Sequence, residues 1–216
     1  MQTLSQKFLT EDEKNRVTEA VKNAELRTSG EIVPMIVSAS YEYPKARIIA
    51  ALFFSFPSAL LLCHLLATIF WLDPDNLYFF FCLFIPLYII FYLTVSRFPI
   101  LTKPFIAKAE MDEEVREEAT KSFFSERLYK TQDANGILLF ISVFESKVWI
   151  PADYGIQEKV EQNTWQTIID DLTTRISGDN RCNAICECVD SIGNILQSHF
   201  PYKRDDSDEL HNLIIR

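Results

Sequence analysis

The sequence predicts a small α/β sandwich interrupted by a two-helix transmembrane hairpin. Two stretches, residues 48–72 and residues 77–96, contain no Asp, Glu, Lys or Arg. A helix rises about 1.5 Å per residue, so roughly 20 residues cross a hydrocarbon core of about 30 Å, and both stretches are long enough. Elsewhere, β-branched or continuously apolar runs at residues 31–39 and 137–143 predict strands, and the segments around them place apolar residues at helical spacing.

The hairpin divides the chain into two predicted parts. Residues 45–97 form the hairpin, and residues 1–44 together with residues 98–216 form one soluble α/β domain. A pair of buried core helices is the alternative, but such helices keep a polar stripe that runs such as Tyr78–Phe81 lack. Residues 1–10 have neither a basic nor an apolar region of the kind found in signal peptides.

The first soluble segment begins with a helix and a strand. Residues 10–13 (Thr-Glu-Asp-Glu) form a capping-box pattern that opens the helix. The strand over residues 31–39 contains Pro34, which lacks a backbone N–H group. We therefore expect Pro34 at a strand edge or a bulge.

The chain returns from the hairpin with a helix predicted over residues 109–130, acidic in its first turns and basic in its last, as the helix macrodipole favours. The strand over residues 137–143 is apolar throughout, so we expect it to be central and covered on both faces. A tight turn at Glu145-Ser146 leads to a second strand at residues 147–150, which predicts an antiparallel hairpin.

Two further helices complete the predicted domain. One follows an N-cap at Asn163 and the other follows Asp179-Asn180, and the polar tail from Pro201 is expected to be extended. A helix lies between the first two strands in the chain, which predicts a parallel pair with a right-handed crossover.

The basic residues beside the spans predict the orientation of the hairpin. Lys45 and Arg47 precede the first span, and Arg97 and Lys103 follow the second. The connection at residues 73–76 carries only acidic charge. Because Lys and Arg are retained on the cytoplasmic side, we expect a two-span membrane protein with both termini in the cytoplasm.

The charge of the chain excludes one class of partner. The net charge is −9, and residues 108–216 carry all of it, with 12 Lys and Arg against 21 Asp and Glu. A domain this acidic lacks the electrostatic footprint of a nucleic-acid-binding protein. We expect the lipid bilayer and a protein partner, or a second copy of the chain, in place of nucleic acid.

The histidine and cysteine residues form no familiar catalytic set, and phosphate-loop, G-x-S-x-G and H-E-x-x-H motifs are absent from the sequence. His64 lies in the first span without a charged partner there, which favours a packing role over proton transfer. Cys182 and Cys186, at i and i+4, could hold a soft metal, but a fourth ligand is not evident. Cys188 falls on an apolar helix face, so structural thiols are favoured.

Several segments resemble the TPM domain family in their order and spacing. In that family an N-G-hydrophobic strand leads through a short turn to a second strand ending in D-x-G-I. The resemblance covers about residues 8–215, and its tail is similar to a membrane-embedded bacterial branch of the family. The matching segments are Ser29–Val33 (SGEIV), Asn135–Ser142 (NGILLFIS), Lys147–Ile150 (KVWI), Asp153–Ile156 (DYGI), the helix with Trp165, and the tail pieces His199–Pro201 and Asp208–Leu210.

This resemblance implies an α/β sandwich and, for the bacterial branch, a place in the inner membrane. Plant thylakoid members are described as acid phosphatases and photosystem-repair factors, and some members bind calcium. Phosphatase activity and calcium binding are therefore expectations from the family, and kinship of fold alone does not establish either.

The predicted topology brings four polar residues to one edge of the sheet. If the two strands are parallel, Glu31, Asp133 and Asn135 lie near their N-terminal ends, and the hairpin returns Asp153 to the same edge. Three carboxylates and an amide are oxygen ligands suited to Ca²⁺ or Mg²⁺. The alternative is that Asn135 and Asp153 make turn hydrogen bonds while the other two side chains are solvated.

Three functions remain open from the sequence. The first is a membrane-tethered binding or assembly module, which the acidic surface and the absence of catalytic motifs favour. The second is a divalent-cation-dependent phosphatase that uses Glu31, Asp133 and Asp153. The third is an oligomeric transport component, which two spans and one histidine support poorly.

Overall fold

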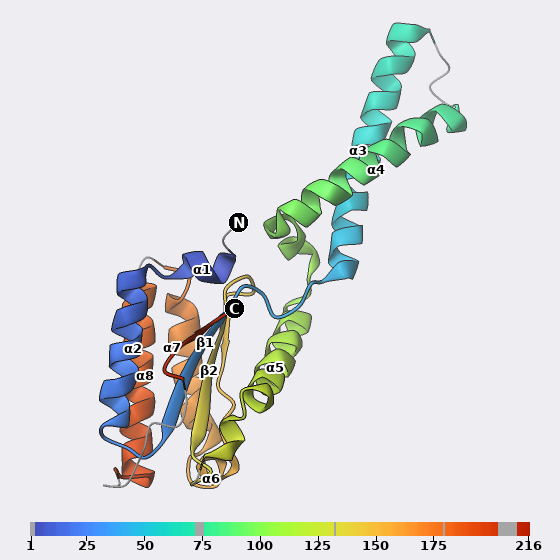
Figure 1. The fold of residues 1–216 in the computed structure, drawn as a ribbon. Coiled ribbons are helices and arrows are strands. Elements are labelled where there is room, and N and C mark those ends of the chain that lie inside the picture. Colours follow the sequence, from blue (N-terminus) through green and yellow to red (C-terminus); the bar gives the residue numbers. More distant parts are fainter. Residues whose placement is uncertain (1–2, 72–75, 132, 179, 203–210) are drawn as a thin grey trace. The chain divides into compact units, whose positions relative to one another are not determined.

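The computed structural model describes residues 3–71, 76–131, 133–178, 180–202 and 211–216 (Figure 1). It confirms a mixed α/β fold with a four-stranded sheet and two long apolar helices. The elements are α1 (Leu4–Phe8), α2 (Glu11–Glu25), β1 (Glu31–Val37), α3 (Pro44–Phe70), α4 (Leu77–Arg97), the 3₁₀ helix η1 (Pro99–Phe105), α5 (Lys108–Ser125), the 3₁₀ helix η2 (Leu128–Lys130), β2 (Gly136–Ser142), β3 (Lys147–Trp149), α6 (Tyr154–Gln157), α7 (Gln162–Arg175), α8 (Arg181–His199) and β4 (Ile214–Ile215).

The chain divides into two compact units. One comprises Met1–Tyr41 with Asp112–Arg216 and holds the sheet, and the other comprises Glu42–Met111 and holds α3 and α4. The first unit is thus assembled from segments on both sides of the second.

The sheet has the strand order β3-β2-β1-β4. β1 and β2 run parallel, with Glu31 opposite Gly136, and β2 and β3 are antiparallel, so both predicted pairings are confirmed. β4 pairs with β1 at Met35 and Ile36 alone among the described residues. β1 lies between β2 and β4, so Pro34 is not on an edge strand as expected. It is tolerated because even-numbered residues of β1 direct their backbone groups away from β2, toward the short β4, whose pairing begins only at Met35.

Successive side chains of the strands point to opposite faces of the sheet, which gives two hydrophobic layers. Ile32 and Ile36 of β1 point to the face covered by α2, α7 and α8. Val33, Met35 and Val37 point to the face covered by α5. Both faces of β1 and β2 are therefore buried between helices, as their continuously apolar sequences predict (Figure 1).

The predicted capping box at the start of α2 is confirmed. The Thr10 hydroxyl accepts the backbone N–H of Glu13 at 3.3 Å, and the Thr10 N–H donates to the Glu13 carboxylate at 2.8 Å. This backbone hydrogen bond lowers the pKa of Glu13 below its ordinary value. The side chains of Thr10 and Glu13 thus satisfy two backbone N–H donors, one at the N-cap and one in the first turn.

Several predicted boundaries are wrong. α5 ends at Ser125 instead of residue 130, because Arg127 adopts a left-handed conformation (φ 61°) that a helix cannot continue through. α7 begins at Gln162 behind Glu161, so Asn163 is not its N-cap. The first strand stops at Val37. The short elements α1, α6 and β4 were not predicted at all.

The second unit consists of α3, α4 and η1. The side chains that α3 buries are all small: Ala46, Ala50, Ala51, Ser55, Ala59, Cys63 and Ala67. These small residues let α4 pack closely, while the large side chains of both helices point outward; Leu61 is 64% exposed and Leu93 is 62% exposed. The predicted Asp73-Pro74-Asp75 turn lies outside the described residues.

Candidate functional site

The N-terminal edge of the sheet carries the residues predicted to form a metal site. The backbone N–H of Glu31 donates to the Asn135 carbonyl at 3.3 Å, and the N–H of Asp153 donates to the Gly136 carbonyl at 2.9 Å. The structure therefore brings Glu31, Asn135 and Asp153 to the same edge, as the topology predicts. Asp133 lies in the turn before β2 and is exposed.

Asn135 is used to join two segments of backbone. Its side chain is buried, its Nδ2 donates to the Ser29 carbonyl, and its N–H donates to the Thr131 hydroxyl at 3.0 Å. These bonds connect the approach to β1 with the approach to β2. This is the turn role that the sequence left open for Asn135.

Asp153 is the N-cap of α6, where its Oδ1 accepts the Tyr154 N–H at 2.7 Å. Its Oδ2 is buried and has no hydrogen-bond partner among the described residues. One such oxygen fits a cation, but Ca²⁺ takes six to eight oxygen ligands. Within the described ranges, no three His, Cys, Asp or Glu side chains converge as metal ligands do. The cation site at Glu31, Asp133, Asn135 and Asp153 stays a prediction.

Two glycines in the motifs that resemble the TPM family lie so close to neighbouring backbone at this edge that a larger residue would not fit. A Cβ atom on Gly136 would lie 2.2 Å from the Leu128 carbonyl oxygen, and one on Gly155 would lie 2.6 Å from the Ala134 carbonyl oxygen. Neither glycine has a positive φ, so the requirement is one of space. The N-G and D-x-G-I motifs therefore pack the start of β2 and of α6 against the 128–134 segment.

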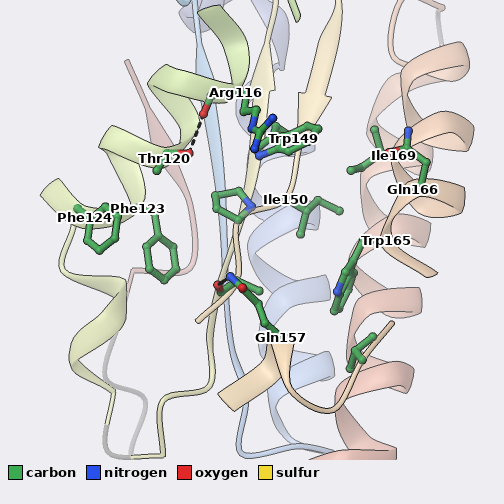
Figure 2. Close-up of a pocket in the computed structure, with 13 residues that line it drawn as sticks. Arg116, Thr120, Phe123, Phe124, Trp149, Ile150, Gln157, Trp165, Gln166 and Ile169 are labelled. Atoms are coloured by element: carbon green, nitrogen blue, oxygen red, sulfur yellow. Dashed lines mark hydrogen bonds between the residues drawn. The ribbon is translucent and has the colours of Figure 1, made fainter. Parts of the chain in front are cut away.

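A second candidate site is a groove beside β3. It encloses about 440 Å³, within the range of ligand-binding pockets. Figure 2 shows α5 residues on one side, α7 residues on the other, and the end of β3 with its following residues between them. We call it the α5–β3–α7 groove; its lining includes Arg116, Thr120, Phe123, Phe124, Trp149, Ile150, Pro151, Ala152, Gln157, Val160, Trp165, Gln166 and Ile169.

The groove contains one cation beside an aromatic ring. The Arg116 guanidinium lies 5.6 Å from the ring centroid of Trp149, a distance at which the ring attracts a cation. In the part of the chain that the structure describes, Arg116 forms no ion pair, whereas the neighbouring Lys147 is paired with Asp112. Arg116 is thus available to an anionic group.

The other polar groups of the groove hold its walls in place. The Thr120 hydroxyl donates to the Arg116 carbonyl at 2.8 Å, as drawn in Figure 2. Gln157 Nε2 donates to the Ala152 carbonyl at 2.6 Å, and Gln166 Nε2 donates to Asp170 at 2.9 Å. The sequence did not reveal this groove, since its residues come from three elements; the two tryptophans near β3 are the signal that could have indicated it.

The three clustered cysteines are placed as structural thiols. Cys188 is buried in the hydrophobic core, and this burial, with a smaller effect of Asp171, raises the pKa of its thiol to about 12. Burial and the adjacent Cys182 raise the pKa of Cys186 to about 11. Thiols with raised pKa values are poor nucleophiles at neutral pH.

Comparison with known proteins agrees with this architecture. Residues 94–195 match the TPM domain family. The NMR structure of BA42 protein from the psychrophilic bacterium Bizionia argentinensis has the same fold, with a TM-score of 0.58 at 20% identity, covering 96% of this chain and 94% of that chain. No curated protein sequence matches the chain.

The matched region runs from the end of α4 into α8 and includes the N-G strand, the β2–β3 hairpin and the D-x-G-I segment. The resemblance to the family, first seen in these motifs, is confirmed, and residues 94–195 of this chain are a TPM domain.

Proposed function

We propose that this chain is an integral membrane protein whose α3–α4 hairpin anchors a TPM domain, and that the TPM domain is a binding module. The observation that carries the binding function is the α5–β3–α7 groove, in which Arg116, without an ion-pair partner among the described residues, lies over Trp149. A partly apolar groove with a single oriented charge is the usual form of a recognition site.

Membrane anchoring is supported by the exposure of the two long helices. Their most apolar 18-residue windows have mean hydropathies of 2.1 and 2.2, and only 28% and 6% of these windows are buried. A core helix of a soluble protein buries most of such a segment. The proposal places both termini on the cytoplasmic side. The basic residues that flank the two spans favour this orientation: Lys45, Arg47, Arg97 and Lys103.

Site-specific photo-cross-linking in membranes tests the binding module. A benzoylphenylalanine in place of Gln166, an exposed residue of the groove, should give discrete adducts in the native host. The same group in place of Lys22, an exposed residue of α2 outside the groove, is the matched control. Adducts that are absent at Gln166, or identical at the two positions, would contradict a binding role for the groove.

A cation-dependent phosphatase is the second candidate, favoured by the buried Asp153 Oδ2. Hydrolysis of p-nitrophenyl phosphate in Ca²⁺ or Mg²⁺ should then fall at least about tenfold in Asp133→Ala and in Asp153→Ser, where serine keeps the N-cap of α6. Unchanged activity in both variants, or no shift of Tm by either cation, excludes the site.

A further inference from the structure

We propose that the α5–β3–α7 groove binds an extended peptide segment of a partner protein, which adds to β3 as a further strand and places a carboxylate against Arg116. This inference rests on the proposed binding function and names the class of partner that the groove accepts. The open edge of β3, the helices on both sides of that edge, and the charge at its rim support it.

β3 presents an unpaired backbone edge. It is the last strand in the order β3-β2-β1-β4. In the antiparallel ladder with β2, Trp149 lies opposite Phe140 and the Pro151 carbonyl accepts the Leu138 N–H at 2.9 Å. Backbone groups alternate in direction along a strand, so those of Val148 and Ile150 point away from β2. No hydrogen bond described outside the β2–β3 ladder uses them.

The open edge lies in a slot between two helices. α5 lies on one face of the sheet and contributes Thr120 and Phe123 to the groove. α7 lies on the other face and contributes Trp165 and Ile169 (Figure 2). An added strand would be covered on both faces, as β1 and β2 are, and would pair its backbone with β3. Strand addition of this kind is a common mode of peptide recognition.

The two walls of the slot differ in character, which predicts a pattern for the peptide. Side chains that point toward α5 meet Arg116, and side chains that point toward α7 meet the apolar surfaces of Trp165 and Ile169. Because successive side chains of a strand alternate between faces, the expected motif is apolar-acidic-apolar. The acidic residue matches the one unpaired cation that the described groove offers.

A second copy of the chain fits this slot less well than a partner peptide does. Two β3 edges paired across a two-fold axis would place both Arg116 guanidinium groups on the same face of the joined sheet, and neither has an ion-pair partner among the described residues. Like charges so placed disfavour association.

Selection of peptides against the full chain in nanodiscs tests the inference. A displayed library of random twelve-residue peptides is selected on the native chain, on Arg116→Glu, and on Lys121→Glu. Lys121 is the matched control, since it lies on the same helix outside the groove and pairs with Glu117. We expect apolar-acidic-apolar peptides from the native chain and from Lys121→Glu, and apolar-basic-apolar peptides from Arg116→Glu.

Backbone methylation of the selected peptide then tests strand addition without altering the protein. N-methyl groups on the amides that face β3 should weaken binding by about tenfold or more, and N-methyl groups on the intervening amides should leave it within about twofold. Equal effects of both sets would overturn strand addition. Selected motifs that Arg116→Glu does not change would overturn the role of Arg116.

The inference and the proposed function can fail separately. If Gln166 cross-links a partner while no peptide is selected, the binding module stands and the extended peptide is wrong. If the chain forms a dimer in nanodiscs whose contact protects the β3 edge, the second copy is the occupant and the peptide is again wrong. If neither cross-links nor peptides are found, both proposals fail.

Discussion

Single residues at the N-terminal edge of the sheet explain why the TPM motifs contain glycine. Gly136 and Gly155 adopt ordinary backbone conformations, and each lies against a carbonyl oxygen of the 128–134 segment. The motif residues Asn135 and Asp153 complete the same arrangement through hydrogen bonds to backbone groups. At this edge, therefore, the residues that identify the TPM motifs are the ones that hold the backbone turns together.

The Gly155→Ala variant should lose stability. Its Cβ atom would lie 2.6 Å from the Ala134 carbonyl oxygen, so the backbone must shift, at a cost of about 1–3 kcal/mol. At roughly 2–4 °C per kcal/mol, Tm should fall by several degrees. Gly178→Ala is the control, because its nearest contact is an ordinary 3.4 Å. Equal Tm values for the two variants would show that the close contact is absent in solution.

The buried thiol of Cys188 should make stability depend on alkaline pH. Burial raises its pKa in the folded state to about 12, above the ordinary value of 9.0. Between these values the folded protein retains a proton that the unfolded chain has released, so the free energy of unfolding falls as pH rises. The limiting slope is about 1.4 kcal/mol per pH unit for one thiol, and it is absent below pH 8.

Denaturant unfolding at several pH values measures this slope. The Cys188→Ala variant should lose stability through its cavity, yet show a shallower fall above pH 9 than the native chain. Parallel curves for the two proteins would indicate that Cys188 is not buried as a neutral thiol.

At the scale of elements, sequence patterns predict correctly those helix starts and strands that are determined by residues within one segment. The capping box of α2 and the two longer strands follow directly from residues 10–13, 31–37 and 136–142. α5 ends early because Arg127 turns left-handed, and the next residue, Leu128, is buried in the core layer under α5, a tertiary contact that the helical pattern does not contain. β4 has two residues and forms only because β1 offers an open side, which no local pattern encodes.

The capping box offers a test at this scale. Thr10→Ala removes the hydroxyl that accepts the Glu13 N–H and should cost about 1 kcal/mol of stability. Thr10→Ser restores an acceptor in the same place and should recover most of the loss. Chemical denaturation of both variants measures the difference, and a serine variant as unstable as the alanine variant would rule out a capping contribution.

At the scale of the whole molecule, the hairpin is inserted between β1 and α5, so the sheet unit is built from chain segments on both sides of it. The sequence alone indicated this arrangement, because uncharged runs of this length are rare outside membranes and the parallel strands flank them. It did not indicate the α5–β3–α7 groove, whose residues meet only after α5 and α7 pack on opposite faces of the sheet.

The central claim is that α3 and α4 cross the bilayer and hold the TPM domain on one side of it. Reporters inserted at Asn76, between the two helices, and fused after Arg216, in the sheet unit, test this directly. We predict activity on opposite sides of the membrane, with the Arg216 reporter in the cytoplasm. Both reporters on the same side would contradict the membrane hairpin.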